Sequence, residues 1–309
     1  MYTIEKMFHS DRVTHNFNKV ASQLQTWLIK QLEASSLDWL NQVIQQLSKQ
    51  PSIYASERTL LMGFSRVTRR VSKATLALTE ADLQTAHKLR AGWNPEGWSV
   101  DQAVRTFMIL SFPTDNADRY VTAIETLFSA ANVAEQIALY QSLPLLPYPE
   151  RFKARAIEGL RSNMTSVFSA IALKNPYPAD YFDEAAWNQM VLKALFVDSH
   201  LSQIQDLDAR ANPKLAQMLS DYAHERWAAG RAVNPQLWRP MGPFAKGLLI
   251  ADLERVLDSP ERFEQQAAAL ACDLSPAPEA QALLDKVPTL KQQIADKQLT
   301  WDSFSLTHP

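Results

Sequence analysis

The sequence predicts an all-α fold, and three observations indicate it. Apolar residues recur every three or four positions along almost the whole chain, which is the period of an amphipathic helix. No stretch shows sustained period-two alternation between hairpin turns. The chain has only seven glycines, whereas strand-rich and nucleotide-binding folds need glycine for turns and phosphate loops. We expect stacked antiparallel helices, as an α-solenoid of the HEAT or armadillo kind or as an irregular bundle.

The N-terminal helices follow from apolar stripes and capping signals. Three stripes predict helices over 13–28, 37–47 and 60–71. Ser36 is expected to cap the second of them. Residues 79–82 read Thr-Glu-Ala-Asp, which has the spacing of a capping box, and the helix that begins there is expected to stop at Gly92.

The remaining helices are separated by prolines, which cannot continue a helix but can begin one. The predicted ranges are 99–112, 116–131, 133–142, 150–173, 182–198, 213–230, 244–257, 259–272, 277–286 and 288–298. After 150–173, the sequence NPYP predicts a rigid turn in which Asn175 ends the helix.

The domain organisation is only weakly marked in the sequence. One boundary is expected near the loop at 93–98, and another near Met241 and Gly242, after which the helices become rich in alanine. These boundaries divide the chain into 1–98, 99–245 and 246–309, and one continuous domain is the alternative.

Composition and motifs exclude several function classes. The formal charge of −2 gives no sign of a nucleic-acid binder. No GxGxxG, GxxxxGK[ST] or GxSxG motif occurs. The six histidines are dispersed, and the single cysteine, Cys272, lies in an apolar segment, where a buried inert thiol is expected. We therefore expect neither a metal site nor a cofactor.

The chain is expected to be soluble and cytoplasmic. The N-terminal segment lacks the apolar core of a secretion signal. The longest nearly apolar stretch, around 167–173, is far too short to cross a bilayer, so no membrane span is predicted.

The helix expected over 213–230 has the residues best suited to catalysis. His224 lies opposite the apolar face, and Asp221, three residues earlier, can reach its imidazole ring. Glu225 lies at the edge between the two faces. With the nearby arginines, these groups suit proton transfer on an anionic substrate. An ordinary solvated face with salt bridges explains the same residues equally well.

The neighbouring segments contain polar and aromatic residues that suit ligand binding. The helix expected over 182–198 is apolar around most of its circumference, so its amides and its lysine need partners. The alternative for that lysine is that its charged end extends to solvent. The candidate ligand-binding residues are Arg161, Asn163, Asn188, Gln189, Lys193, Arg226, Trp227, Arg231 and Trp238.

Five segments between Arg105 and Phe244 resemble the EboA family, whose members are described as metabolite traffic proteins. The segments are LPLLP, EGLRSNMTSVFSAIALKNPYP, WNQMVLKALF, LDARANPKLAQMLSDYAHERWAAGR and LWRPMGPF. The resemblance implies a cytoplasmic protein that works beside other products of the ebo gene cluster in secondary metabolism. It also implies a small polar metabolite, phosphorylated or otherwise anionic, as the molecule that the pathway handles.

Three functional interpretations follow. The first is a binding or scaffold protein that holds a polar precursor or a partner enzyme. The second is an enzyme of the same pathway, in which His224 is the general acid/base and Asp221 or Glu225 orients it. In the third, these groups are satisfied inside a helical core and have only a structural role.

Overall fold

The structure is a computed structural model that describes residues 17–49 and 53–307. Its described residues form helices and no β-strand, apart from one isolated bridge between Thr75 and Ser99, so the all-α prediction is confirmed. Val13, the first residue of the expected N-terminal stripe, lies outside the described residues, and so do His9, His15 and His308. No helix in the described ranges combines the length and the apolar character that a membrane crossing requires.

The chain divides into two compact units, one ending at Tyr181 and the other beginning at Phe182. The domain boundaries expected after residues 98 and 245 remain predictions.

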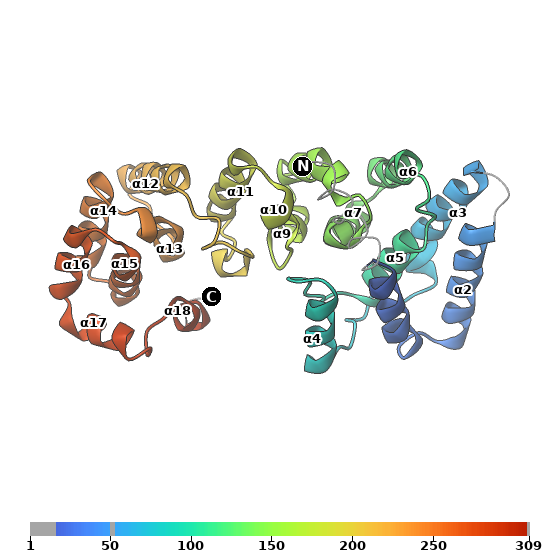
Figure 1. Cartoon of the computed structure of the whole chain (residues 1–309), viewed down its shortest axis with the longest axis horizontal. Helices are drawn as coiled ribbons and strands as arrows, with labels where there is room; N and C mark the ends of the chain where they lie inside the picture. The colour runs from blue at the N-terminus through green and yellow to red at the C-terminus, as the bar shows by residue number, and fades with distance from the viewer. Residues whose placement is uncertain (1–16, 50–52, 308–309) are drawn as a thin grey trace, which may run out of the picture. The chain divides into compact units, whose positions relative to one another are not determined.

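The first unit is built from helices that contact one another in succession (Figure 1). After a helix over 17–29, it contains α2 (Ala34–Lys49), α3 (Ile53–Arg66), η1 (Val67–Arg69), α4 (Glu80–Leu89), α5 (Val100–Leu110), α6 (Ala117–Ala130), α7 (Val133–Ser142), η2 (Leu143–Leu145), η3 (Pro149–Phe152), α8 (Lys153–Leu160), α9 (Thr165–Ala172) and α10 (Tyr177–Tyr181). Helix α3 contacts α5, α5 contacts α7, and α7 contacts α9, while α2, α6 and α8 pair with their successors. Paired helices stacked in this way match the solenoid-like expectation.

Capping accounts for several helix starts in this unit. Thr79 and Asp82 form the predicted capping box, in which the Asp82 carboxylate also accepts a 2.8 Å hydrogen bond from the Trp27 indole. The prediction for Ser36 was wrong, because α2 begins at Ala34. The Ser36 hydroxyl lies within the helix and donates to the carbonyl oxygen of Arg70.

The single helix expected over 150–173 is two helices, α8 and α9, broken at 161–164. Gly159, near the end of α8, permits the close packing at this break, because a Cβ there would lie 2.4 Å from the Tyr140 ring and 2.6 Å from Ile171. The missing side chain lets α9 fold back against α8, and the Ser162 hydroxyl accepts the Met164 amide in the turn. The continuous apolar stripe therefore belonged to two helices whose stripes are in phase.

Helix α9 ends at Ala172, and Lys174 with φ +50° takes the left-handed position after it, so Asn175, which was expected to end the helix, lies beyond its end and bonds back to it. Its side-chain amide donates to the carbonyl oxygens of Ala170 and Tyr140, and its Oδ1 accepts the amide of Tyr177. The buried Asn175 side chain thus holds the turn with three hydrogen bonds.

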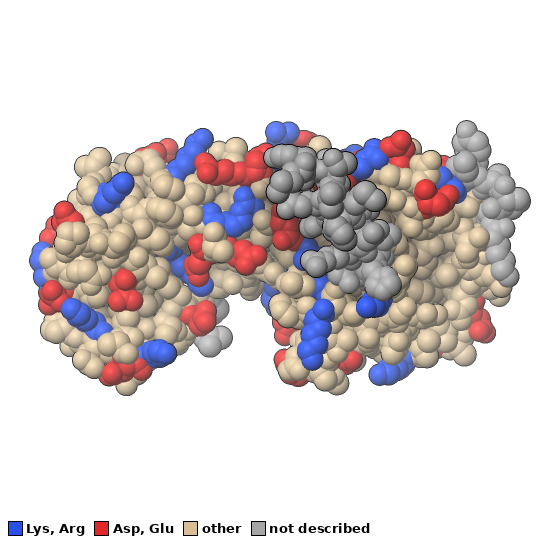
Figure 2. Space-filling view, in the orientation of Figure 1, with Lys and Arg blue, Asp and Glu red and all other residues tan. Residues whose placement is uncertain are grey.

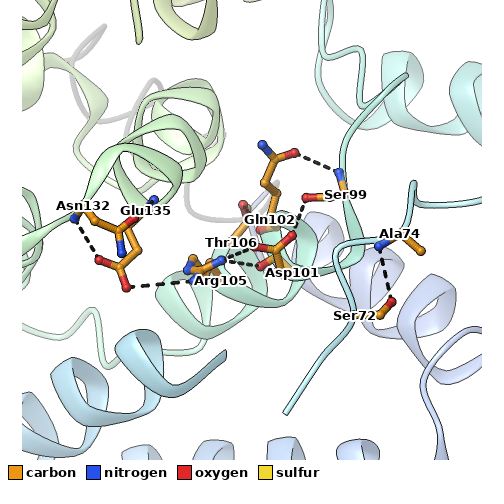
Figure 3. A network of polar contacts seen from close by, with 9 residues as sticks. All are labelled: Ser72, Ala74, Ser99, Asp101, Gln102, Arg105, Thr106, Asn132 and Glu135. Carbon is orange, nitrogen blue, oxygen red and sulfur yellow. Dashed lines mark hydrogen bonds and ion pairs between the residues drawn. The ribbon is translucent and has the colours of Figure 1, made fainter. Parts of the chain in front are cut away.

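The first unit contains a fully buried charged side chain, Arg105, whose polar contacts are drawn in Figure 3. Arg105 of α5 donates to Asp101 at 2.5 Å and lies 3.9 Å from a Glu135 carboxylate oxygen of α7. Its guanidinium also lies over the Phe64 ring of α3, 5.4 Å from the centroid. These contacts connect α3, α5 and α7 through one cation.

The second unit is a bundle around α15 (Arg262–Leu274). Its other elements are α11 (Glu184–Phe196), η4 (Leu201–Gln203), α12 (Pro213–Ala228), η5 (Pro235–Leu237), α13 (Trp238–Met241), η6 (Gly242–Phe244), α14 (Leu248–Leu257), α16 (Pro278–Asp285), α17 (Pro288–Ala295) and α18 (Trp301–Thr307). Residues 267–272 of α15 are all buried, and the helix contacts α13, α14, α16, α17 and α18. Its small alanine side chains let several neighbouring helices approach closely. The second unit thus matches the expected alternative of an irregular bundle.

Candidate functional site

The second unit contains a pocket of about 630 Å³ that is open to solvent. Its walls come from the end of α11 and the following loop, from α12, from η5 and from single residues of α15 and α18. The lining residues are Leu195, Phe196, Asp198, His200, Tyr222, Arg226, Ala232, Val233, Asn234, Pro235, Gln236, Phe263 and Phe304. The volume lies within the range of about 300–1,000 Å³ that small-molecule sites occupy.

Gln236 is the most buried polar group in the pocket, with 4% of its surface exposed. Its Oε1 accepts the backbone amide of Ser202 at 3.1 Å, which fixes the orientation of the side chain. Its Nε2 donates to no atom of the described residues. A buried amide bonded on one side only leaves its N–H groups for the contents of the pocket.

Asn234 and Arg226 add further donors to the same pocket. Asn234 caps η5 by accepting the Gln236 amide at its Oδ1, so its Nδ2 is the end that remains for a ligand. Arg226 donates from Nε to the carbonyl oxygen of Ala232 at 2.9 Å. This bond holds the guanidinium at the pocket wall.

The turn after α12 explains how these groups come together. Gly230 adopts φ +64°, and its amide donates to Trp227 while the Arg231 amide donates to Arg226. This is the glycine-terminated helix end that reverses the chain direction. The returning segment reaches Asn234 and Pro235, which begin η5 beside the helix that the chain has just left.

The predicted catalytic residue, His224, lies outside this pocket. It is two residues from both Tyr222 and Arg226, which is about 200° around an α-helix, whereas those two line the pocket. Its Nε2 lies 2.6 Å from Oδ1 of Asp252 on α14, and the other carboxylate oxygen of Asp252 accepts the Ser220 hydroxyl. The buried Asp252 therefore orients the imidazole.

Asp221 does not occupy the position that the sequence suggested for the orienting carboxylate. It accepts a 2.9 Å hydrogen bond from Gln217, and Asp252 lies beside His224 instead. Glu225 is exposed. Sequence spacing identified neighbours along one helix, whereas the carboxylate beside His224 comes from another helix, 28 residues away.

Two of the predicted aromatic residues form a stack beside His224. The Trp227 and Trp238 rings lie 5.9 Å apart, and the Arg255 guanidinium lies 4.1 Å from the Trp227 ring centroid. The His224 ring lies 5.3 Å from Trp227. Trp238 is buried, so it supports this cluster from inside the unit.

The polar residues predicted on α11 have separate surroundings. Asn188 is buried, and its side chain exchanges two hydrogen bonds with that of Asn212, at 2.8 and 3.1 Å, which joins α11 to the cap of α12. Gln189 is exposed. Partial burial lowers the pKa of the half-buried Lys193. The two hydrogen bonds with Asn212 give Asn188 a role in joining the helices.

The remaining predicted residues are exposed. Arg231 follows α12. Arg161 pairs with Glu158 at 2.8 Å in the first unit, and Asn163 lies in the α8–α9 turn. Of the predicted ligand-binding set, Arg226 is the member that lines the pocket.

Sequence reasoning missed Gln236, Asn234, His200 and Asp252. One signal was available for Asp252, because it lies on the apolar face of its helix, between Leu249 and Val256. A carboxylate in that position needs partners within the fold. For Gln236 and Asn234, the dipeptide Asn-Pro indicated a turn and gave no indication of a pocket.

Surface charge gives little further guidance. On the face shown in Figure 2, acidic and basic side chains are interspersed. No group of three or more His, Cys, Asp or Glu residues with metal-binding geometry occurs within residues 17–49 and 53–307. The second unit also has an open pocket of about 600 Å³ that Pro213, Phe244 and Leu248 help to line. Buried or half-buried polar side chains occur at the first pocket and at the His224 cluster.

Comparison with known proteins gives one match. A family model described as "Metabolite traffic protein EboA" matches residues 20–242. The match begins well before Arg105, so it includes most of the first 98 residues, which contain none of the five segments that indicated the family. No curated protein and no solved structure matches the chain.

Proposed function

The chain belongs to the EboA family, and from this premise we propose that it is a binding protein of a metabolite-traffic pathway. It holds a small polar molecule in the pocket of the second unit. We further propose that it acts in the cytoplasm, in secondary metabolism, beside other proteins encoded in the ebo gene cluster. A partner enzyme from that cluster would receive or deliver the molecule.

The observation that supports this function best is the side-chain amide of Gln236. Its Oε1 accepts a hydrogen bond from the Ser202 backbone, and its Nε2 donates to no described residue. The residue is 4% exposed, and the bond from Ser202 to its Oε1 fixes the direction in which its Nε2 points, so that Nε2 can donate to a molecule in the pocket. Arg226 and Asn234 direct additional donors to the same pocket. A molecule rich in acceptor oxygens would satisfy all three.

The direct test is capture of metabolites from an extract of the source cells by the purified full-length protein, read by mass spectrometry. Arg226→Gln removes the pocket cation, and Arg231→Gln is the matched control, because Arg231 is exposed and lies outside the pocket. We expect the Arg226 variant to lose about tenfold in affinity, as for one charged hydrogen bond, and the control to bind normally. Equal capture by all three proteins would refute the pocket as the site.

The Asp252–His224 contact supports a second candidate function, an enzyme of the same pathway. A buried carboxylate on one ring nitrogen fixes the orientation of the imidazole, as a general acid/base requires. Since His224 does not line the pocket, its substrate would have to bind at the exposed Trp227–Arg255 face.

Metabolite profiling of a strain that lacks the gene separates the two candidates. The strain is complemented with the wild type or with His224→Gln, and both proteins are quantified. A finished product that accumulates in the wrong compartment and is corrected by both versions supports traffic. An earlier intermediate that only the wild type removes, at equal protein abundance, establishes the enzyme.

A further inference from the structure

Two opposite charges line the pocket, the exposed Asp198 and the half-buried Arg226. Asp198 and Arg226 form no ion pair together, and neither forms one with any other residue in the described ranges. A pocket designed for a simple anion has no need of a carboxylate in its wall, because like charges repel. The opposed pair therefore indicates a ligand that has charges of both signs.

Asp198 occupies a backbone position that glycine normally takes. It follows α11 with φ +55°, and the next amide, that of Ser199, donates back to the carbonyl oxygen of Ala194 at 2.8 Å. A carboxylate is also unfavourable at a helix C-terminus, where the dipole favours cations. Asp198 thus has two local costs that glycine would avoid.

The third component of the pocket is aromatic. Phe196, two residues before Asp198, is 77% exposed, which is unusual for so large an apolar side chain. Phe263 of α15 and Phe304 of α18 line the same pocket. These rings provide an apolar wall beside the charged groups.

We infer that the ligand is a compact zwitterion: an amino acid or another acid that also has an amine, with an apolar or ring-shaped side group. This inference rests on the proposed function. The acid group faces Arg226 and the Gln236 amide, the ammonium group faces Asp198, and the side group lies against the phenylalanine rings. Such a molecule compensates both pocket charges at once.

Three probes with the same phenyl ring separate the contributions of the two charges. L-phenylalanine has both charges, 3-phenylpropionate has only the negative one, and phenethylamine has only the positive one. Leucine, 4-methylpentanoate and isopentylamine repeat the comparison with an aliphatic group. Affinities for the full-length protein are measured by calorimetry or ligand-observed NMR. Both zwitterions are expected to bind about tenfold more tightly than their singly charged analogues.

Two substitutions assign the charges. Asp198→Asn keeps a residue that tolerates positive φ and removes the carboxylate. It should weaken the zwitterions and the amines and leave the acids unchanged. Arg226→Gln should weaken the zwitterions and the acids and leave the amines unchanged, and Arg231→Gln should alter none of them.

Each failure has its own signature. If the acids bind as well as the zwitterions, or Asp198→Asn does not weaken the zwitterions, the inference is overturned and the pocket remains an anion site. If no probe binds while Arg226-dependent capture from the extract persists, the zwitterion class is also excluded. Loss of the extract capture itself would refute the proposed function rather than this inference.

Discussion

In the first unit Arg105 is fully buried beside two carboxylates and a phenyl ring, and its Nε and Nη2 have no hydrogen-bond partner among the described residues. In the second unit the side chain of Gln236 is 4% exposed, and its Oε1 is bonded within the protein while its Nε2 donates to no described residue. Carboxylate oxygens of Asp101 and Glu135 lie 2.5 and 3.9 Å from the Arg105 guanidinium within the fold (Figure 3). Gln236 instead lies against a pocket of about 630 Å³. Burial alone thus fails to distinguish structural from functional polar groups. The two cases differ in what surrounds the polar atoms that have no hydrogen-bond partner among the described residues: packed side chains at Arg105, and a pocket at Gln236.

The largest expected effect tests this contrast directly. Arg105→Met leaves Asp101 and Glu135 buried without their cation, and removing one partner of a buried pair costs about 3–5 kcal/mol. Arg226→Met should cost less than about 1 kcal/mol, because that side chain is half-buried in an open pocket. Urea unfolding, with hydrogen exchange to locate the loss, measures both changes.

The double variant Asp101→Asn with Arg105→Met is the control for this prediction. Neutralising the carboxylate that was left behind should restore part of the lost stability. If Arg105→Met alone proves as stable as the wild type, the Arg105 guanidinium does not stabilise the two buried carboxylates beside it.

The next effect is steric and lies in the second unit. A Cβ on Gly242 would lie 2.7 Å from the carbonyl oxygen of Ala271, and backbone cannot move aside as a side-chain end can. Gly242→Ala should therefore destabilise the bundle by about 1–3 kcal/mol. Hydrogen exchange should increase around α13 and α15 and stay unchanged in α5 and α7. Loss of protection in the first unit instead would contradict the division into two units.

A smaller effect separates the roles of Ser220 and His224. Ser220→Ala removes a donor to the buried Asp252 and should cost about 1–3 kcal/mol. His224→Gln should cost less than about 1 kcal/mol, because the histidine side chain is 61% exposed and glutamine retains an N–H donor. Thermal unfolding of both variants gives the order. If His224→Gln is the more damaging, the histidine is chiefly a structural partner of Asp252.

The fold was largely predictable because its signals are local. Apolar spacing located most helices, and the residue types at Thr79 and Asp82 specified a cap that depends only on neighbours in sequence. The break between α8 and α9 was hidden, since apolar residues continue across it at helical spacing and the close packing of Gly159 against Tyr140 is a tertiary contact.

The site was predictable only in part, for the same reason. Arg226 was identified as a basic residue on a helix with unusual composition. Gln236 became significant only when folding placed Ser202 beside its Oε1 and left its Nε2 in a pocket. The Asp252–His224 contact likewise joins two helices. The spacing of residues along one helix does not show which residues of another helix will lie beside them.

The smallest predicted effect is a pH dependence of the stability of the first unit, which comes from Asp82. Both carboxylate oxygens of Asp82 accept hydrogen bonds within the protein, whereas the pocket groups have donors that bond to no described residue. Hydrogen bonds from the side chain and backbone of Thr79, with a further one from Trp27, lower the pKa of Asp82 below its ordinary value of 3.8. A carboxyl group whose pKa is lower in the folded state stabilises the protein above its unfolded pKa. That contribution is lost as the pH falls through the folded pKa.

Asp82→Asn should therefore be less stable than the wild type near neutral pH, and the difference should shrink as the pH falls below about 4. Thermal unfolding of both proteins across the acid range checks this, and a difference that is independent of pH would show that the ionised carboxylate contributes nothing to the cap of α4.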